Sequence, residues 1–191
     1  MAEIPPTDLN LCGSCTACAL AETRNQVVVS RGSASAALML IGEAPGARED
    51  ATGQPFVGRS GQALDRLLVE VGFDLERDVY ICNAVKCRPP GNRRPKRLEL
   101  AACRPWLDLQ LQQVNPAAVV LAGATAVEAI LGIKKGGMTQ LRGRWQRWQD
   151  RAVMPIFHPS YLLRNPSPDE GAPIDLTRRD LAAVRQHLCE R

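Results

Sequence analysis

The sequence lacks any apolar run long enough to cross a bilayer, so we expect no membrane-spanning segment. Its N-terminal stretch, MAEIPPTDLN, has neither the basic start nor the apolar core of a secretory signal peptide. No internal repeat or low-complexity tract interrupts the 191 residues, which excludes a repeat architecture. We therefore expect a single cytoplasmic domain, residues 1–191, that makes no contact with a membrane.

The sequence also has little excess charge, because 24 lysines and arginines face 20 aspartates and glutamates, leaving a net charge of +4. This balance is compatible with a nucleic-acid partner but does not by itself predict one. Hydrophobic residues make up 45% of the chain, which is enough for one domain with a substantial core.

A second, separate CxxC pair is missing as well, although the chain has seven cysteines. In a reducing compartment an odd number of cysteines argues against a disulfide framework and favours metal binding. Cys15 and Cys18 form a CxxC pair, but a zinc ribbon would need a second one. Cys87 and Cys103 stand alone, and one pair with two single thiolates suits a [4Fe–4S] cluster, with zinc as the alternative metal.

Cys12 complicates this assignment, because Cys12–Cys15 and Cys15–Cys18 are overlapping CxxC pairs. Ordinary burial is a common fate for cysteine, and it is the simpler interpretation of any single thiol. We prefer that interpretation for Cys82, in a predicted strand, and Cys189, in the last predicted helix. Spacing alone leaves the ligand set open.

Short apolar segments alternate with helical ones along the chain. Strands are expected at residues 37–41, 79–83, 118–122 and 153–157, and helices at 62–71, 98–114, 124–131 and 175–188, with a short N-terminal helix within 10–21. Residues 142–148, which contain Gly143, indicate an irregular or hairpin insertion before the last strand. The alternation predicts an α/β fold in which helices cover both faces of a mainly parallel, four-stranded sheet.

Three polar segments follow three of these strands: GEAPGARED at 42–50, CNAVKCRPPGNRR at 82–94 and HPSYLLR at 158–164. Ligands of open α/β sheets gather beyond the carboxyl ends of the strands, so the three segments should converge on one site. Glycines in the first segment let the backbone approach a ligand closely. Its acids, Glu43, Glu49 and Asp50, argue against a simple phosphate cradle.

Five blocks, in this order, resemble the family-4 uracil-DNA glycosylases: GEAPGARED, QPFVGRSGQ at 54–62, NAVKCRPPGNRRP at 83–95, CRPWL at 103–107 and HPSYLLRNP at 158–166. The resemblance covers nearly the whole chain and implies a three-layer α/β/α fold. It also implies a structural [4Fe–4S] cluster held by Cys15, Cys18, Cys87 and Cys103, which would leave Cys12 outside the ligand set.

The activity that the resemblance implies is hydrolysis of the N-glycosidic bond of uracil in DNA, after the base has been flipped out of the duplex. His158 would donate to the oxyanion that develops at uracil O2, although a lone histidine after a strand is more often structural. Asn83 would recognise the base edge and Phe56 would stack on the ring; a turn asparagine and a core phenylalanine are the simpler interpretations.

The resemblance places the backbone of Gly42, Glu43 and Ala44 along the base and the attacking water. Ala44 falls where related glycosylase families have a water-activating aspartate, so a nearby acid must take that part. We assign the catalytic part to Glu49 and substrate binding to Glu43.

DNA contacts are implied for two segments. After the histidine, an apolar wedge would enter the duplex while polar residues meet phosphate: Ser160, Leu162, Leu163 and Arg164. In the loop between the single cysteines, Arg88, Arg93 and Arg94 would meet phosphates, whereas a solvated loop is the simpler interpretation. We expect a monomer whose partner is uracil-containing DNA.

Two other functions stay open. A binding protein of the same superfamily would bind uracil-containing DNA without cleaving the glycosidic bond. One branch of the superfamily becomes covalently attached to its DNA through a histidine in an added basic loop. The corresponding loop here, residues 93–98, contains no histidine, which counts against that branch. An iron–sulfur redox protein is disfavoured, because no flavin, nicotinamide or second-cluster motif accompanies the cysteines.

Overall fold

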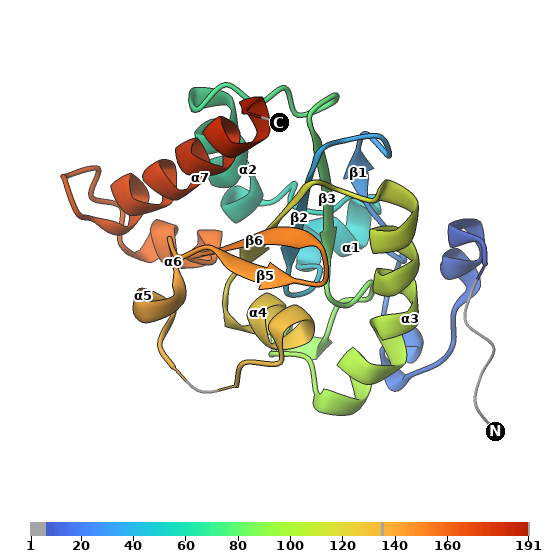
Figure 1. The fold of residues 1–191 in the computed structure, drawn as a ribbon. Coiled ribbons are helices and arrows are strands. Elements are labelled where there is room, and N and C mark those ends of the chain that lie inside the picture. The colour runs from blue at the N-terminus through green and yellow to red at the C-terminus, as the bar shows by residue number, and fades with distance from the viewer. Residues whose placement is uncertain (1–6, 135, 191) are drawn as a thin grey trace.

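The computed structural model describes residues 7–134 and 136–190 (Figure 1). Its strands are β1 (Arg31–Gly32), β2 (Leu38–Gly42), β3 (Val79–Asn83), β4 (Ala118–Ala122), β5 (Gln146–Trp148) and β6 (Arg151–Ile156). Its α-helices are α1 (Ala47–Thr52), α2 (Arg59–Glu70), α3 (Arg97–Val114), α4 (Ala124–Leu131), α5 (Met138–Leu141), α6 (Pro159–Arg164) and α7 (Pro173–Cys189). Three short 3₁₀ helices complete the set: η1 (Leu9–Ser14), η2 (Ala19–Glu22) and η3 (Pro90–Asn92).

The strands form one sheet in the order β1-β3-β2-β4-β6-β5. The four central strands are parallel, as predicted. Two short antiparallel edge strands extend the sheet: β1, which the sequence pattern did not reveal, and β5, which lies in the segment predicted as an irregular or hairpin insertion. Every residue of β2, β3 and β4 is buried, which explains why these segments read as continuous apolar runs rather than as alternating ones.

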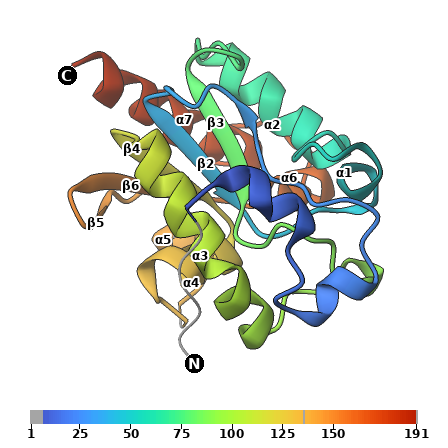
Figure 2. The ribbon, with the colours of Figure 1, turned by 90° about the vertical axis from the view of Figure 1, so that its right-hand side faces the viewer.

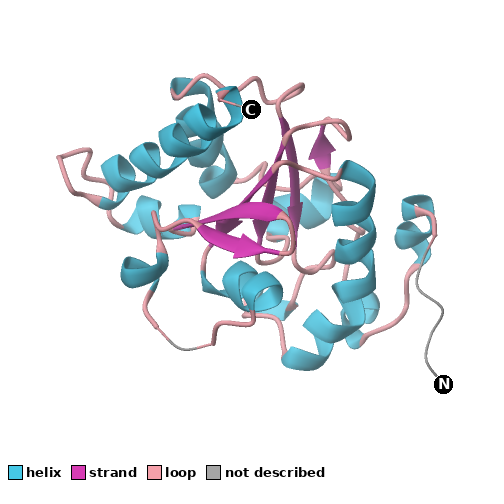
Figure 3. Cartoon of the chain, in the orientation of Figure 1, coloured by secondary structure: helices cyan, strands magenta, loops and turns pink. Residues whose placement is uncertain are grey.

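Helices cover both faces of the sheet, so the predicted three-layer α/β/α arrangement is confirmed (Figures 1 and 3). Alternate strand residues such as Leu40 and Val120 pack against α2, α6 and α7. Their neighbours, such as Ile41 and Leu121, pack against α3 and α4 on the other face. Figure 2 shows α3 crossing in front of the sheet, with the N-terminal segment beside it.

The N-terminal segment differs from the prediction of one helix within residues 10–21. It forms η1 and η2, which are separated by an extended stretch in which Cys15 and Cys18 have β-region dihedral angles. The hairpin insertion is confirmed, because β5 pairs with β6 through Trp148 and Arg151. Within the described residues no helix is long and apolar enough to cross a membrane.

The carboxyl ends of the parallel strands meet at one edge of the sheet. Gly42, the last residue of β2, pairs with Asn83, the last residue of β3. On the other side of β2, Ala122 of β4 pairs with Ile156 of β6, directly before the histidine segment. The three polar segments that follow these strands therefore start close together.

Candidate active site and cysteine pocket

A pocket of about 570 Å³ lies at this edge of the sheet, within the size range of small-molecule sites. All three predicted segments line it. The sequence-predicted residues in its wall are Glu43, Ala44, Glu49, Phe56, Asn83, His158, Ser160 and Arg164. The convergence expected from the strand ends is therefore present in the structure.

Asn83 contributes a polar side chain to the wall of this pocket. The side chain is only 2% exposed, and its Oδ1 has no hydrogen-bond partner in the described part of the chain. A buried amide oxygen without a partner is costly unless a ligand or water completes it. The pocket thus offers an unfilled hydrogen-bonding position.

Gly42 is required where it lies, because Phe56 and Asn83 crowd against it. A Cβ atom at Gly42 would overlap both the Phe56 ring and Asn83 Oδ1. Phe56 is buried and packs with the core cluster, yet its ring also lines the pocket. Its φ of 56° is uncommon for a bulky residue, and such strain tends to occur at functional sites.

The hydrogen bonds of His158 indicate which of its ring nitrogens carries the proton. Nδ1 accepts the backbone N–H of Ser160 at 3.2 Å and lies 2.8 Å from Ser160 Oγ. Because a backbone N–H can only donate, Nδ1 is the acceptor of a neutral ring and Nε2 carries the hydrogen. Burial lowers the pKa of His158 below 6.5; Glu43 opposes that shift and Arg164 adds to it.

The two acids predicted for the site have different surroundings. The Glu49 carboxylate accepts the backbone N–H groups of Gly46 at 3.0 Å and Gly58 at 2.7 Å, and so fixes the loop before α2. Glu43 accepts a hydrogen bond from Thr125, a buried residue of α4, and its charge acts on His158. Both side chains line the pocket, and neither is paired with a cation in the described structure.

The segment after His158 forms helix α6, and its members have separate environments. Ser160 and Arg164 line the pocket. Leu163 is 36% exposed, but Leu162 is 2% exposed and belongs to the core cluster. The structure therefore does not support the expected contact of Leu162 with DNA, because a turn of helix directs that side chain inward. Tyr161, which we did not select, is 37% exposed.

The loop cations expected to contact phosphates are largely occupied within the protein. Arg93 forms a two-point contact with Glu99 at 2.8 and 2.6 Å, and Arg94 pairs with Glu128 at 2.5 Å. Arg88 donates to Asn92 at 2.8 Å. None of these three arginines lines the pocket, and their hydrogen bonds and ion pairs brace the loop.

Sequence reasoning missed four polar residues of the pocket wall: Arg48, Arg59, Ser60 and Asn92. Arg48 and Arg59 are exposed and lie in α1 and at the start of α2. Their signal was available, because both arginines belong to blocks on which the resemblance rests. The acids of GEAPGARED were assigned roles at the site, whereas its single arginine, Arg48, was not.

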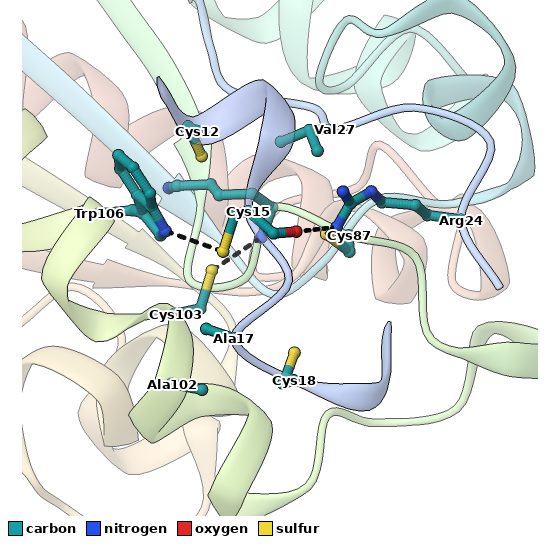
Figure 4. Close-up of a pocket in the computed structure, with 11 residues that line it drawn as sticks. Cys12, Cys15, Ala17, Cys18, Arg24, Val27, Cys87, Ala102, Cys103 and Trp106 are labelled. Atoms are coloured by element: carbon teal, nitrogen blue, oxygen red, sulfur yellow. Dashed lines mark hydrogen bonds between the residues drawn. The ribbon is translucent and has the colours of Figure 1, made fainter. Parts of the chain in front are cut away.

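A second pocket gathers five cysteines from distant parts of the chain (Figure 4). Cys12, Cys15 and Cys18 come from the N-terminal segment, Cys87 follows β3 and Cys103 lies in α3. All seven cysteines of the chain are free. Cys82 is buried in β3, as we expected, whereas Cys189 is exposed at the end of α7, contrary to the prediction of a buried thiol.

Three of these sulfurs accept hydrogen bonds. Trp106 Nε1 donates to Cys15 at 3.2 Å, the backbone N–H of Lys86 to Cys103 at 3.2 Å, and Arg24 Nη1 to Cys87 at 3.4 Å. Figure 4 shows Trp106 and Arg24 on opposite sides of the thiols. Burial raises the pKa of Cys103 to about 11, so an unligated thiol there is protonated at neutral pH.

Within residues 7–134 and 136–190 no three His, Cys, Asp or Glu side chains are close enough to bind one metal ion. The other histidine, His187, packs against Trp145 with a centroid distance of 4.8 Å and lines neither of these two pockets.

Comparisons with known proteins agree with this arrangement. The family model described as the uracil DNA glycosylase superfamily matches residues 29–182. A type-4 uracil-DNA glycosylase of Thermotoga maritima is 49% identical over 154 residues, 80% of each chain. Type-4 enzymes of Sulfurisphaera tokodaii and Saccharolobus solfataricus are 39% and 36% identical over 81% and 80% of this chain, which is 73% and 74% of theirs. The chain belongs to the uracil DNA glycosylase superfamily, and type-4 uracil-DNA glycosylases are among its relatives.

Proposed function

We propose that this protein hydrolyses the N-glycosidic bond of uracil in DNA, releasing free uracil and leaving an abasic site for base excision repair. The oxygen of a water molecule bonds to C1′ of the deoxyribose, and the C1′–N1 bond breaks with its electron pair passing to uracil. The observation that carries the proposal is the buried, unpartnered Asn83 Oδ1 in the same pocket as a neutral His158.

Recognition of the base rests on Asn83 and Phe56. The Asn83 amide accepts from uracil N3–H through Oδ1 and donates to uracil O4 through Nδ2. Cytosine presents the opposite pattern, and leaving a buried polar group unpaired can cost about 10⁴–10⁵ in specificity. Phe56 stacks on the flipped ring, while Glu43 and Ala44 line the pocket around it. Gly42 is not part of the pocket wall, but its lack of a side chain leaves room for Phe56 and Asn83.

His158 stabilises the leaving base. Its Nδ1 is committed to Ser160, so Nε2–H is the donor toward uracil O2, where negative charge develops. A neutral donor is suitable because its burial disfavours the imidazolium form. Removing one such preorganised donor costs about 10²–10³ in kcat.

Glu49 orients the water in this proposal. Two backbone N–H groups hold its carboxylate, which uses two of about four lone-pair positions and leaves the others for a water hydrogen. Glu43 acts on substrate binding and, by its charge, on His158. The division of roles follows from rigidity: Glu49 is fixed by main-chain donors and Glu43 by one hydroxyl.

DNA lies across the rim of the pocket. In this proposal Leu163, which is exposed, is the apolar side chain that replaces the flipped base, and Ser160 and Arg164 of the pocket wall contact phosphate. Arg48 and Arg59 add two further cations at the same opening. Arg88, Arg93 and Arg94 contribute from the outer side of their loop. Uracil-containing DNA is the partner, and the enzyme acts as a monomer in the cytoplasm.

The cysteine pocket fits a [4Fe–4S] cluster held by Cys15, Cys18, Cys87 and Cys103. Support comes from the shared cavity and from N–H donors to three of the four sulfurs, which suit thiolate ligands. When bound, the cluster ties the N-terminal segment to the loop before α3. Brown protein with iron and labile sulfide is expected, and colourless protein with zinc would reject the cluster.

The direct test is incubation with an oligonucleotide that contains one uracil. We expect free uracil and an alkali-labile abasic site, and severe loss of both with His158→Ala. Matched thymine, cytosine and hypoxanthine oligonucleotides define specificity. Tight binding that leaves the uracil oligonucleotide intact would support the binding protein instead and reject the proposed reaction.

A further inference from the structure

Lys86 is a buried cation that the proposed reaction does not use. It follows β3 by three residues and is only 1% exposed, as the largest fully buried side chain of the described chain. No carboxylate pairs with it among residues 7–134 and 136–190. Burying an ammonium group without an anionic partner is costly, so the surroundings of Lys86 need to supply negative charge.

Lys86 shares a pocket with five cysteine side chains. Its side chain lines the cysteine pocket, and its backbone N–H donates to Cys103 Sγ at 3.2 Å. Four thiolates around iron and sulfide carry net negative charge, which is the countercharge that Lys86 lacks.

The same ammonium group contacts the backbone of a residue that lines the proposed uracil pocket. Lys86 Nζ donates to the backbone carbonyl of Asn83 at 2.5 Å, and the Lys86 carbonyl accepts the N–H of Val28 at 2.8 Å. Between them, Ala84 N–H donates to Gly42 and Val85 N–H donates to Glu43. One short segment thus joins the cysteine pocket to the backbone that carries Asn83.

We propose that Lys86 is a positioning residue that neutralises the cysteine-held cluster and, through the carbonyl of Asn83, fixes the residue that recognises uracil. The inference rests on the proposed cluster and the proposed base contact. A positive charge beside a cluster favours its reduced state, so Lys86 raises the reduction potential. Its hydrogen bond keeps Asn83 in register with the flipped base, where small displacements lower the rate.

Two variants separate these effects in the cluster-loaded protein. Lys86→Met keeps the volume but removes charge and donor, whereas Lys86→Gln keeps a donor without the charge. We expect a more negative midpoint potential for both, measured by spectroelectrochemistry. Single-turnover uracil release should fall about tenfold in Lys86→Met and recover in part in Lys86→Gln. Lys134→Met removes an exposed lysine and should match the wild type in both measurements.

A double-mutant cycle tests the route through Asn83. In an Asn83→Ala background, Lys86→Met should cause little further loss of rate, since interacting residues are non-additive. Wild-type potential and rate in Lys86→Met would overturn the inference. If Lys86→Met does not fold, the potential of Lys86→Gln decides: a negative shift supports the inference and an unchanged value overturns it.

Failure of the underlying proposals gives different results. Wild-type protein without iron and labile sulfide would reject the cluster, and with it the countercharge of Lys86. Wild-type protein that holds the cluster but releases no uracil would reject the proposed reaction. In that case the potentials of the two variants still test the charge of Lys86.

Discussion

The backbone N–H of Ser160 donates to His158 Nδ1 at 3.2 Å, so the first turn of α6 determines the tautomer of the ring. Gly123 makes this placement possible from the other side. It has a φ of 91°, and a Cβ there would come within 2.9 Å of the His158 Cβ. The imidazole is therefore held between the end of β4 and the start of α6, with Nε2 as its donor.

His158→Ala should lower kcat about 10²–10³-fold while changing KM little, because the lost hydrogen bond strengthens as charge develops on the leaving base. Single-turnover release of uracil measures the effect. His187→Ala is the matched control, since His187 packs on Trp145 away from the pocket. Equal losses in the two variants would show that His158 acts only through folding.

The rate should fall on acidification as His158 becomes protonated. Burial lowers its pKa below 6.5, so the neutral donor dominates at and above that pH and is lost only as the pH falls further. The unfolded chain binds this proton at higher pH than the folded one, so the associated stability is complete above pH 6.5 and declines below it. A pH–rate profile for kcat measures the acidic limb.

Glu43→Gln should move that acidic limb to lower pH, because the Glu43 carboxylate raises the pKa of His158 against the larger effect of burial. A limb at unchanged pH would contradict this coupling. Glu49→Gln should instead lower kcat about 10²-fold without moving the limb, since it removes one acceptor from the proposed water site. The comparison separates the roles assigned to the two acids.

Most of the central fold was predictable, because three fully buried parallel strands and a fourth, β6, that is buried over its last four residues leave apolar runs in the sequence. The edge strand β1 was not, since its two residues carry no periodicity, and for β5 the sequence indicated only an irregular or hairpin insertion. The N-terminal helix was also wrong: Cys15 and Cys18 are extended there, and their placement around the cysteine pocket overrides local helix propensity.

The site was predictable where the backbone fixes it and less so where side chains compete. Strand ends placed Gly42, Asn83 and the histidine segment together. Whether an arginine faces DNA or Glu99 depends on tertiary pairing that no local pattern encodes, as Arg93 shows. Leu162 and Leu163 likewise differ by one helical step, which sends one side chain to the core and the other to solvent.

The different burial of Leu162 and Leu163 gives a paired prediction. Leu162→Ala should lower the free energy of unfolding by about 2–5 kcal/mol, because it opens a cavity in the core, while the folded fraction keeps its activity. Leu163→Ala should change stability by less than about 0.5 kcal/mol but weaken excision from double-stranded DNA. Excision from single-stranded DNA, which needs no wedge, serves as the internal control. Equal losses on both substrates would contradict the wedge.

The five thiols of the cysteine pocket provide the last prediction. Trp106 donates to Cys15 Sγ at 3.2 Å, whereas no hydrogen bond within the described residues reaches Cys12 Sγ. Burial raises the pKa of Cys12 and also that of Cys103, a proposed ligand, so the hydrogen bond from Trp106 is what distinguishes Cys15 from Cys12. Cys12→Ala should therefore retain full iron and labile sulfide, whereas Cys15→Ala should lose them and melt at lower temperature. If Cys12→Ala loses iron and Cys15→Ala retains it, Cys12 is the cluster ligand and Cys15 is not.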